Sequence, residues 1–218
     1  MNIYETARAS MVESQLRPNR MTDEALIRAF SQLRRELFVP EQLRGVAYID
    51  EDLPLGGGRY LMQPMVAARL LQVAAVERKD SVLVVGAGVG YEAALLSMMA
   101  RSVIALEENA DLARFGRSAL VEHGIASVTY VEAPLQAGHR QRAPYDVILF
   151  GGGVAEIPAE IDAQLGEGGR MLAVLRPVSG VGRATVVVRT GGVLAHRVIF
   201  DAATPLLPGF VPKPAFVF

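Results

Sequence analysis

One segment in the middle of the chain constrains the fold more than any other. A short apolar run from Ser81 to Val85 is followed at once by Gly86-Ala87-Gly88-Val89-Gly90, and then by helix-forming residues that begin at Tyr91. Buried parallel strands are apolar runs of this kind. Glycines permit the positive φ angles of a sharp turn. The segment therefore predicts a buried parallel strand, a glycine loop and a helix.

Strands and helices continue to alternate after this unit. The patterns predict strands at 102–106, 127–131 and 145–150, and helices at 111–122 and 158–165. Three more strands, at 170–175, 184–189 and 194–199, follow close together. Alternating elements indicate a doubly wound, Rossmann-like α/β sheet, and strands that crowd together indicate an antiparallel edge. We expect a seven-stranded, mostly parallel sheet with an antiparallel C-terminal edge.

The first part of the chain has a different pattern. It predicts a helix at 2–16, a second helix capped by Thr22 and bounded by Pro40, an irregular segment or short hairpin at 48–64, and a helix at 65–76. A chain of 218 residues is long enough for one domain with a terminal elaboration. We expect one domain over 1–218, in which N-terminal helices and a glycine-rich loop (1–80) precede the ligand-binding core (81–218).

The glycine loop is the candidate ligand site. In doubly wound sheets, ligands bind outside the carboxyl ends of the strands, where the strand order reverses. The loop allows close approach of the main chain, and the following helix offers free amides. Glu107, followed by Glu108, ends the second strand and stands 21 residues after Gly86, the spacing at which a carboxylate accepts hydrogen bonds from ribose hydroxyls. This spacing predicts an adenosine-type ligand.

The position after the loop separates the possible adenosine ligands. Tyr91 stands where the dinucleotide fingerprint has its last glycine, which disfavours NAD. No lysine follows the loop, so ATP and GTP are disfavoured as well. The remaining G-x-G-x-G turn favours S-adenosylmethionine over NAD, although NAD stays open at this point.

Composition excludes several other functions. Lysine and arginine total 22 against 23 acidic residues, a balance that argues against a nucleic-acid or membrane-surface binder. The chain has no cysteine, and His123, His139 and His196 are widely separated, so no metal site is expected. The N-terminal residues are charged throughout, and no apolar run has the length of a membrane span, so we expect a cytoplasmic protein.

The chain resembles the protein-L-isoaspartate O-methyltransferases, which are class I methyltransferases, over nearly its whole length. The matching features are ELFVP at 36–40, Tyr48 with Asp50, LPLGGGRYLMQPMVAARLL at 53–71, VLVVGAGVGYEAALL at 82–96, Glu107, APYDVILFGGGVAEIP at 143–158 and QLGEGGRML at 164–172. The glycine-rich segment that ends in Gln63-Pro64 is specific to this family rather than to methyltransferases in general.

The resemblance implies a function and a set of site residues. It implies S-adenosyl-L-methionine as the cofactor and methylation of isoaspartyl α-carboxylates for protein repair, so proteins or peptides with isoaspartyl residues are the implied partners. The cofactor is expected against Gly86 to Tyr91, with Glu107 on the ribose. The adenine is expected near Ala133, Pro134 and Leu135.

The chain departs from the family pattern at two single positions and one triplet. Met62 replaces the Ser or Thr whose hydroxyl contacts the substrate carboxylate, Val84 replaces an acid before the first glycine, and Ala133-Pro134-Leu135 replaces Gly-Asp-Gly. Main-chain amides near Met62 and Gln63 are then expected to hold the acceptor carboxylate. The alternative is a non-catalytic or altered-substrate homologue that keeps the fold and has lost isoaspartyl methylation.

Overall fold

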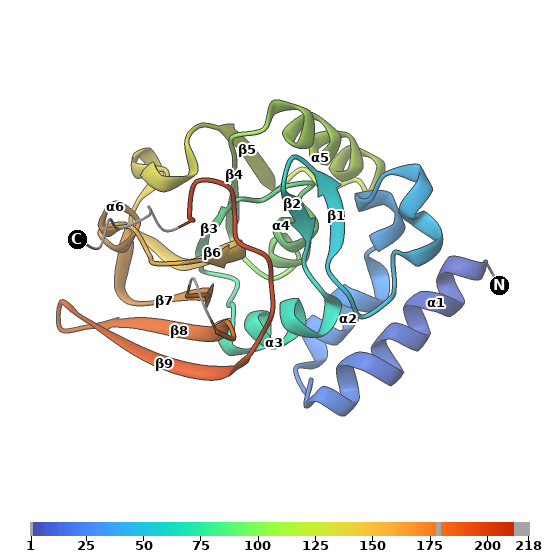
Figure 1. Ribbon diagram of the computed structural model, residues 1–218, viewed down its shortest axis with the longest axis horizontal. Helices are drawn as coiled ribbons and strands as arrows, with labels where there is room; N and C mark the ends of the chain where they lie inside the picture. Colours follow the sequence, from blue (N-terminus) through green and yellow to red (C-terminus); the bar gives the residue numbers. More distant parts are fainter. Residues whose placement is uncertain (1, 178–179, 212–218) are drawn as a thin grey trace.

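Seven strands form one central sheet in the computed structural model, which describes residues 2–177 and 180–211 (Figure 1). The strand order is β5-β4-β3-β6-β7-β8-β9. The first five strands of this order run parallel, and β8 and β9 pair antiparallel at one edge. The predicted α/β sheet with an antiparallel C-terminal edge is confirmed. The strands are β3 (Ser81–Val85), β4 (Ser102–Glu107), β5 (Val128–Glu132), β6 (Tyr145–Val154), β7 (Leu165–Leu175), β8 (Arg183–Thr190) and β9 (Val193–Asp201).

Several predicted bounds are wrong: the helix Glu24–Gln32 ends well before Pro40, β7 begins at Leu165 rather than at 170, and β6 differs as well. This strand extends to Val154, beyond the predicted end at 150, and its pairing with β7 shifts between Leu149 and Gly153. Gly151 lies so close to the carbonyl oxygen of Gly86 that a β-carbon there would collide with it. The glycines therefore let β6 continue past β3 at close range, where the sequence pattern indicated only a turn.

Helices and a small hairpin precede the sheet and connect its strands. α2 is capped by Asp23, whose carboxylate accepts hydrogen bonds from the amides of Ala25 and Leu26, so the predicted Thr22 cap is wrong by one residue. Among the described helices, none combines the length and apolar character needed to cross a membrane. The elements are α1 (Ile3–Met11), a π-helical turn (Val12–Leu16), 3-10 turns (Arg17–Asn19, Arg35–Phe38, Glu41–Val46, Leu135–Ala137, Arg140–Arg142), α2 (Glu24–Gln32), β1 (Leu53–Gly56), β2 (Arg59–Leu61), α3 (Pro64–Ala74), α4 (Tyr91–Ser97), α5 (Ala110–Glu122) and α6 (Ala159–Asp162).

The two faces of the sheet carry separate apolar clusters. Side chains alternate between faces along a strand, so Val82 and Val84 of β3 join a large cluster with the N-terminal helices, α3 and α4. Leu83 and Val85 join a smaller cluster on the opposite face. Val84, where the family pattern has an acid, is therefore a fully buried core residue.

The chain returns across the sheet after β9. Residues 202–210, which we call the return segment, run over β6 and past the end of β3, as the red ribbon in Figure 1 shows. The amide of Gly153 donates to the carbonyl oxygen of Pro205 (2.8 Å), and the amide of Leu207 donates to that of Gly153 (2.7 Å). The return segment therefore lies at the carboxyl ends of the central strands, where the ligand site is predicted.

Candidate functional site

The glycine loop between β3 and α4 is a tight main-chain turn. Gly86, Gly88 and Gly90 have φ angles of 74°, 54° and 85°, a region that favours glycine. The amides of Gly86 and Ala87 both donate to the carbonyl oxygen of Leu106 at 2.9 Å. The loop is thereby fixed against the end of β4, in the place that the sequence pattern predicts.

Glu107 ends β4 directly beside this loop. Its side chain is fully buried. One carboxylate oxygen, Oε2, accepts a hydrogen bond from the amide of Gly88 (2.6 Å), and the other, Oε1, accepts one from the amide of Asn109 (2.9 Å). The structure thus brings together Glu107 and the glycine loop, whereas Glu108 is exposed and does not join them.

Arg59 of β2 completes this cluster, and sequence reasoning missed it. Its Nη1 donates to Oε1 of Glu107 (2.8 Å), and its Nη2 donates to the carbonyl oxygen of Gly86 (2.6 Å). The side chains are 3% exposed for Arg59 and 0% exposed for Glu107. A buried carboxylate needs a partner of opposite charge or several donors, and here it has both.

Leucine side chains cover the remaining space over the loop. A β-carbon built on Gly86 would lie 3.0 Å from both methyl groups of Leu207 and 3.1 Å from Nη2 of Arg59. A β-carbon built on Gly88 would lie 3.6 Å from Leu55 of β1. The hairpin and the return segment therefore close over the glycine loop from two sides.

The predicted acceptor-side residues lie at the start of α3. Met62 is buried (1% exposed), and its carbonyl oxygen accepts a hydrogen bond from Nη2 of Arg35 (2.8 Å). The amide of Gln63 donates to Oδ1 of Asp52 (2.8 Å), and burial raises the pKa of Asp52. The Gln63 amide that we expected to hold a substrate carboxylate is therefore already engaged by a carboxylate of the chain itself.

Tyr91 turns away from the glycine loop. Its ring is fully buried and makes edge contacts with Phe30 and Phe38, at centroid distances of 6.2 and 5.4 Å. The guanidinium of Arg35 lies 4.7 Å from the ring centroid, and burial raises the pKa of the Tyr91 hydroxyl. Only the main chain of Tyr91 therefore lies at the loop, and the side chain belongs to the helical layer.

The three residues predicted near the adenine have different environments. Ala133 is half-buried and Pro134 is exposed. Leu135 is buried (1% exposed) in the smaller apolar cluster. Leu135 is therefore a core residue, Ala133 packs against the same cluster, and Pro134 is the exposed residue of the three.

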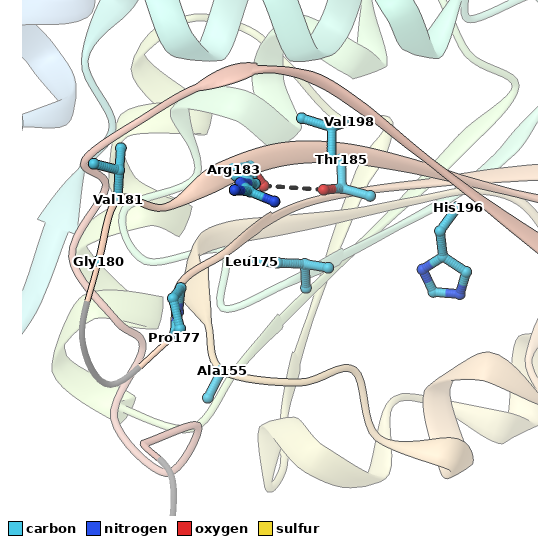
Figure 2. Close-up of a pocket in the computed structure, with 9 residues that line it drawn as sticks. All are labelled: Ala155, Leu175, Pro177, Gly180, Val181, Arg183, Thr185, His196 and Val198. Carbon is cyan, nitrogen blue, oxygen red and sulfur yellow. Dashed lines mark hydrogen bonds between the residues drawn. The ribbon is translucent and has the colours of Figure 1, made fainter.

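Two hollows lie apart from the glycine loop. A cavity of about 500 Å³, shown in Figure 2, is lined by residues of β7, β8 and β9, among them Leu175, Thr185 and His196, and by Ala155, which follows β6. A groove of about 1050 Å³ runs from Gln136 to Phe210 along the end of β6. Neither lining includes Glu107 or the glycine loop. Within the described residues, no three His, Asp or Glu side chains gather in a metal-binding arrangement.

Comparison with known proteins gives consistent matches. The family model described as protein-L-isoaspartate(D-aspartate) O-methyltransferase (PCMT) matches residues 7–198. A protein-L-isoaspartate O-methyltransferase of Methanoculleus marisnigri is 36% identical over 186 residues, covering 85% of this chain and 84% of the relative. Another, of Koribacter versatilis, is 38% identical over 165 residues, covering 76% of this chain and 74% of the relative.

Solved structures match in fold. A structure of a protein-L-isoaspartate O-methyltransferase has a TM-score of 0.80 at 24% identity, covering 93% of this chain and 66% of that chain. A putative protein-L-isoaspartate O-methyltransferase of Plasmodium falciparum, in complex with S-adenosyl-L-homocysteine, has a TM-score of 0.79 at 17% identity, covering 95% of this chain and 99% of that chain. At these identities the likeness shows the fold.

Proposed function

Because the chain belongs to the protein-L-isoaspartate(D-aspartate) O-methyltransferase family, we propose that it transfers a methyl group from S-adenosylmethionine to the α-carboxylate of isoaspartyl residues. Its partners are then aged proteins and peptides that carry such residues. We further place the protein in the cytoplasm, where a chain without cysteine needs no oxidising compartment for its fold.

The observation that carries the proposal is the position of Glu107. Its carboxylate lies at the mouth of the glycine loop, 2.6 Å from the amide of Gly88, on the strand next to β3. An acid at this place is suited to accept hydrogen bonds from a ribose diol, and the glycine main chain is suited to lie against an amino-acid tail. The loop and Glu107 therefore fit an adenosyl cofactor, provided that Arg59 and Leu207 make room.

The proposed methyl transfer needs little general acid or base catalysis. A carboxylate has a reference pKa of about 4 and is ionised at neutral pH, so it needs no general base. When bound, S-adenosylmethionine supplies a methyl group on a sulfonium that a carboxylate oxygen can attack. The chain has to align that oxygen with the methyl group and exclude water, and alignment alone can supply much of the rate.

We propose that the Gln63 carboxamide orients the acceptor. Met62 offers no hydroxyl, and the Gln63 amide is engaged by Asp52. The half-buried side chain of Gln63 is a polar group at the start of α3 that can donate to a carboxylate. Replacing it, as in Gln63→Ala, should lower methyl transfer and leave cofactor affinity unchanged. A loss of cofactor affinity in this variant would assign Gln63 to the cofactor instead.

Two measurements on the purified protein test the proposed function. Calorimetric titration with S-adenosylhomocysteine measures cofactor binding, and transfer of labelled methyl to an isoaspartyl peptide measures activity. The same peptide with a normal aspartyl residue is the control and should stay unlabelled. Binding without transfer would indicate an altered substrate, and absence of binding would indicate the non-catalytic alternative.

A further inference from the structure

We propose that Arg59 competes with the cofactor for Glu107, so that cofactor binding requires the Arg59 guanidinium to leave the site. The inference rests on the proposed function, because it concerns the same adenosyl site. It assigns to the β1–β2 hairpin the role of a closure that controls cofactor affinity.

The competition follows from where the guanidinium lies. Arg59 bridges two groups that an adenosyl ligand would approach, the carboxylate of Glu107 and the carbonyl oxygen of Gly86, at 2.8 and 2.6 Å. The bridge lies over the glycine loop, since Nη2 of Arg59 comes within 3.8 Å of a β-carbon built on Gly88. A ribose on Glu107 and the guanidinium of Arg59 would therefore need the same space.

The hydrogen-bond inventory of Glu107 supports the same conclusion. Main-chain amides of Gly88 and Asn109 already donate to the two carboxylate oxygens, and both come from fixed elements of the fold. Arg59 is the donor that comes from a side chain, and it can rotate away. A ribose diol can replace it as donor to Glu107, so the carboxylate keeps its partners after the exchange.

The closed arrangement leaves one polar atom unsatisfied. Nε of Arg59 is buried and has no hydrogen-bond partner among the described residues. An unpaired buried donor raises the free energy of the closed state, whereas water would satisfy the same group after release. Two hydrogen bonds therefore stabilise the closed position of Arg59, whereas the unpaired Nε destabilises it. This balance fits a reversible closure.

The hairpin that carries Arg59 is short and turns at glycines. β1 and β2 have only four and three residues, and they are joined by a turn of Gly57 and Gly58, which have positive φ, as does Gly56 at the end of β1. β-carbons built on Gly57 and Gly58 would lie 3.5 Å from Asn109 and from Pro208, so the turn lies beside the N-cap of α5 and the return segment. Glycine main chain has the widest choice of conformations, which suits a hinge.

Closure lowers the apparent affinity in proportion to the closed population. For a ligand that binds only the open state, the apparent dissociation constant is the intrinsic one divided by the open fraction. Removing the Arg59 bridge should raise the open fraction and tighten binding, although it removes a positively charged group from the site. A stabilising contact of Arg59 with the cofactor would have the opposite effect.

The test is titration of S-adenosylhomocysteine into wild type and Arg59→Gln. We expect Arg59→Gln to bind at least about tenfold more tightly. The matched control is Arg170→Gln, which removes another arginine from a buried partner, since Nη2 of Arg170 lies 2.6 Å from Oδ2 of Asp80 at the start of β3. This control should bind like wild type, and a gain there as well would overturn the proposal, because general loosening would then explain the effect.

Two other outcomes also overturn the competition and separate it from the proposed function. Equal or weaker binding by Arg59→Gln than by a wild type that binds would overturn the closure and leave the proposed function intact. No binding by either protein would overturn both. If Arg59→Gln unfolds, Arg59→Lys is titrated instead, because lysine can pair with Glu107 but lacks the fork that also reaches Gly86. It should bind more tightly than wild type, and unchanged affinity would contradict the closure.

Discussion

The hydroxyl group of Tyr130 donates a hydrogen bond of 3.1 Å to the carbonyl oxygen of Gly88. Burial raises the pKa of this hydroxyl, and the nearby charge of Glu107 raises it further, so the group keeps its proton. Tyr130→Phe should therefore lower the free energy of unfolding by about 1 kcal/mol and loosen the glycine loop. We expect weaker binding of S-adenosylhomocysteine in a calorimetric titration.

Tyr145→Phe is the matched control for this prediction. The Tyr145 hydroxyl donates to the carbonyl oxygen of His139 at 2.8 Å, at the amino end of β6 and away from the glycine loop. Tyr145→Phe should lower the free energy of unfolding by a similar amount and bind S-adenosylhomocysteine as the wild type does. Equal affinities of the two variants would show that Tyr130 does not shape the loop.

Gly151 should tolerate no side chain. A β-carbon at this position would collide with the carbonyl oxygen of Gly86. The main chains of Gly151 and Gly86 both lie at the centre of the sheet, so neither can easily move aside. Gly151→Ala should lower the free energy of unfolding by about 1 to 3 kcal/mol, as overpacked cores do. Gly45→Ala is the control, because a β-carbon there meets no atom within 4 Å. Equal losses in chemical denaturation would contradict the close contact.

Met62→Ser tests whether the missing hydroxyl limits the chemistry. The variant should transfer more labelled methyl to an isoaspartyl peptide, and it should lose about 2 to 4 kcal/mol of stability, because Met62 is 1% exposed in the core. Met21→Ser, at a site 3% exposed, should lose similar stability without a gain in transfer. A folded Met62→Ser that binds cofactor without gaining activity would direct attention to Arg59 and Gln63.

His123 should make the stability depend on pH. Its ring stacks on Phe38 at 5.3 Å, and burial lowers the pKa of the imidazole in the folded state below the usual 6.5. A depressed pKa means that the unfolded chain binds the proton more readily, so this contribution is present above about pH 6.5 and is lost as pH falls through the folded pKa. Wild type should therefore lose more stability than His123→Phe between about pH 7.5 and pH 5. Parallel losses in chemical denaturation would contradict the shift.

The central strands could be predicted because their residues are buried on both faces of the sheet. Val82, Leu83, Val84 and Val85 are all buried, so a continuous apolar run marks β3 without ambiguity. The end of β6 could not be predicted in this way, because three glycines indicate a turn in sequence. They continue the strand here, since Gly86 leaves no room for a side chain at Gly151, and the return segment leaves none at Gly152 and Gly153.

Arg59 shows why the candidate site was only partly predictable. The spacing of Glu107 from the glycine loop is a local property of one β-α-β unit, and the sequence carries it directly. Arg59 meets Glu107 across 48 positions of the chain, from a hairpin outside that unit. The one available signal was indirect, since a carboxylate at the end of a buried strand requires a cation or several donors.

The return segment has a consequence for biosynthesis. Leu207 and Phe210 fill the smaller apolar cluster beside Val85 and Phe150, which are synthesised much earlier. Until the ribosome has released the return segment, that face of the nascent sheet is uncovered and can bind chaperones or other unfinished chains. Contacts this distant in sequence also slow folding, so this face of the sheet is expected to be covered late in folding. The opposite face of the sheet does not have to wait for its cover in this way. The first helices of the layer that covers it are synthesised before any strand of the sheet.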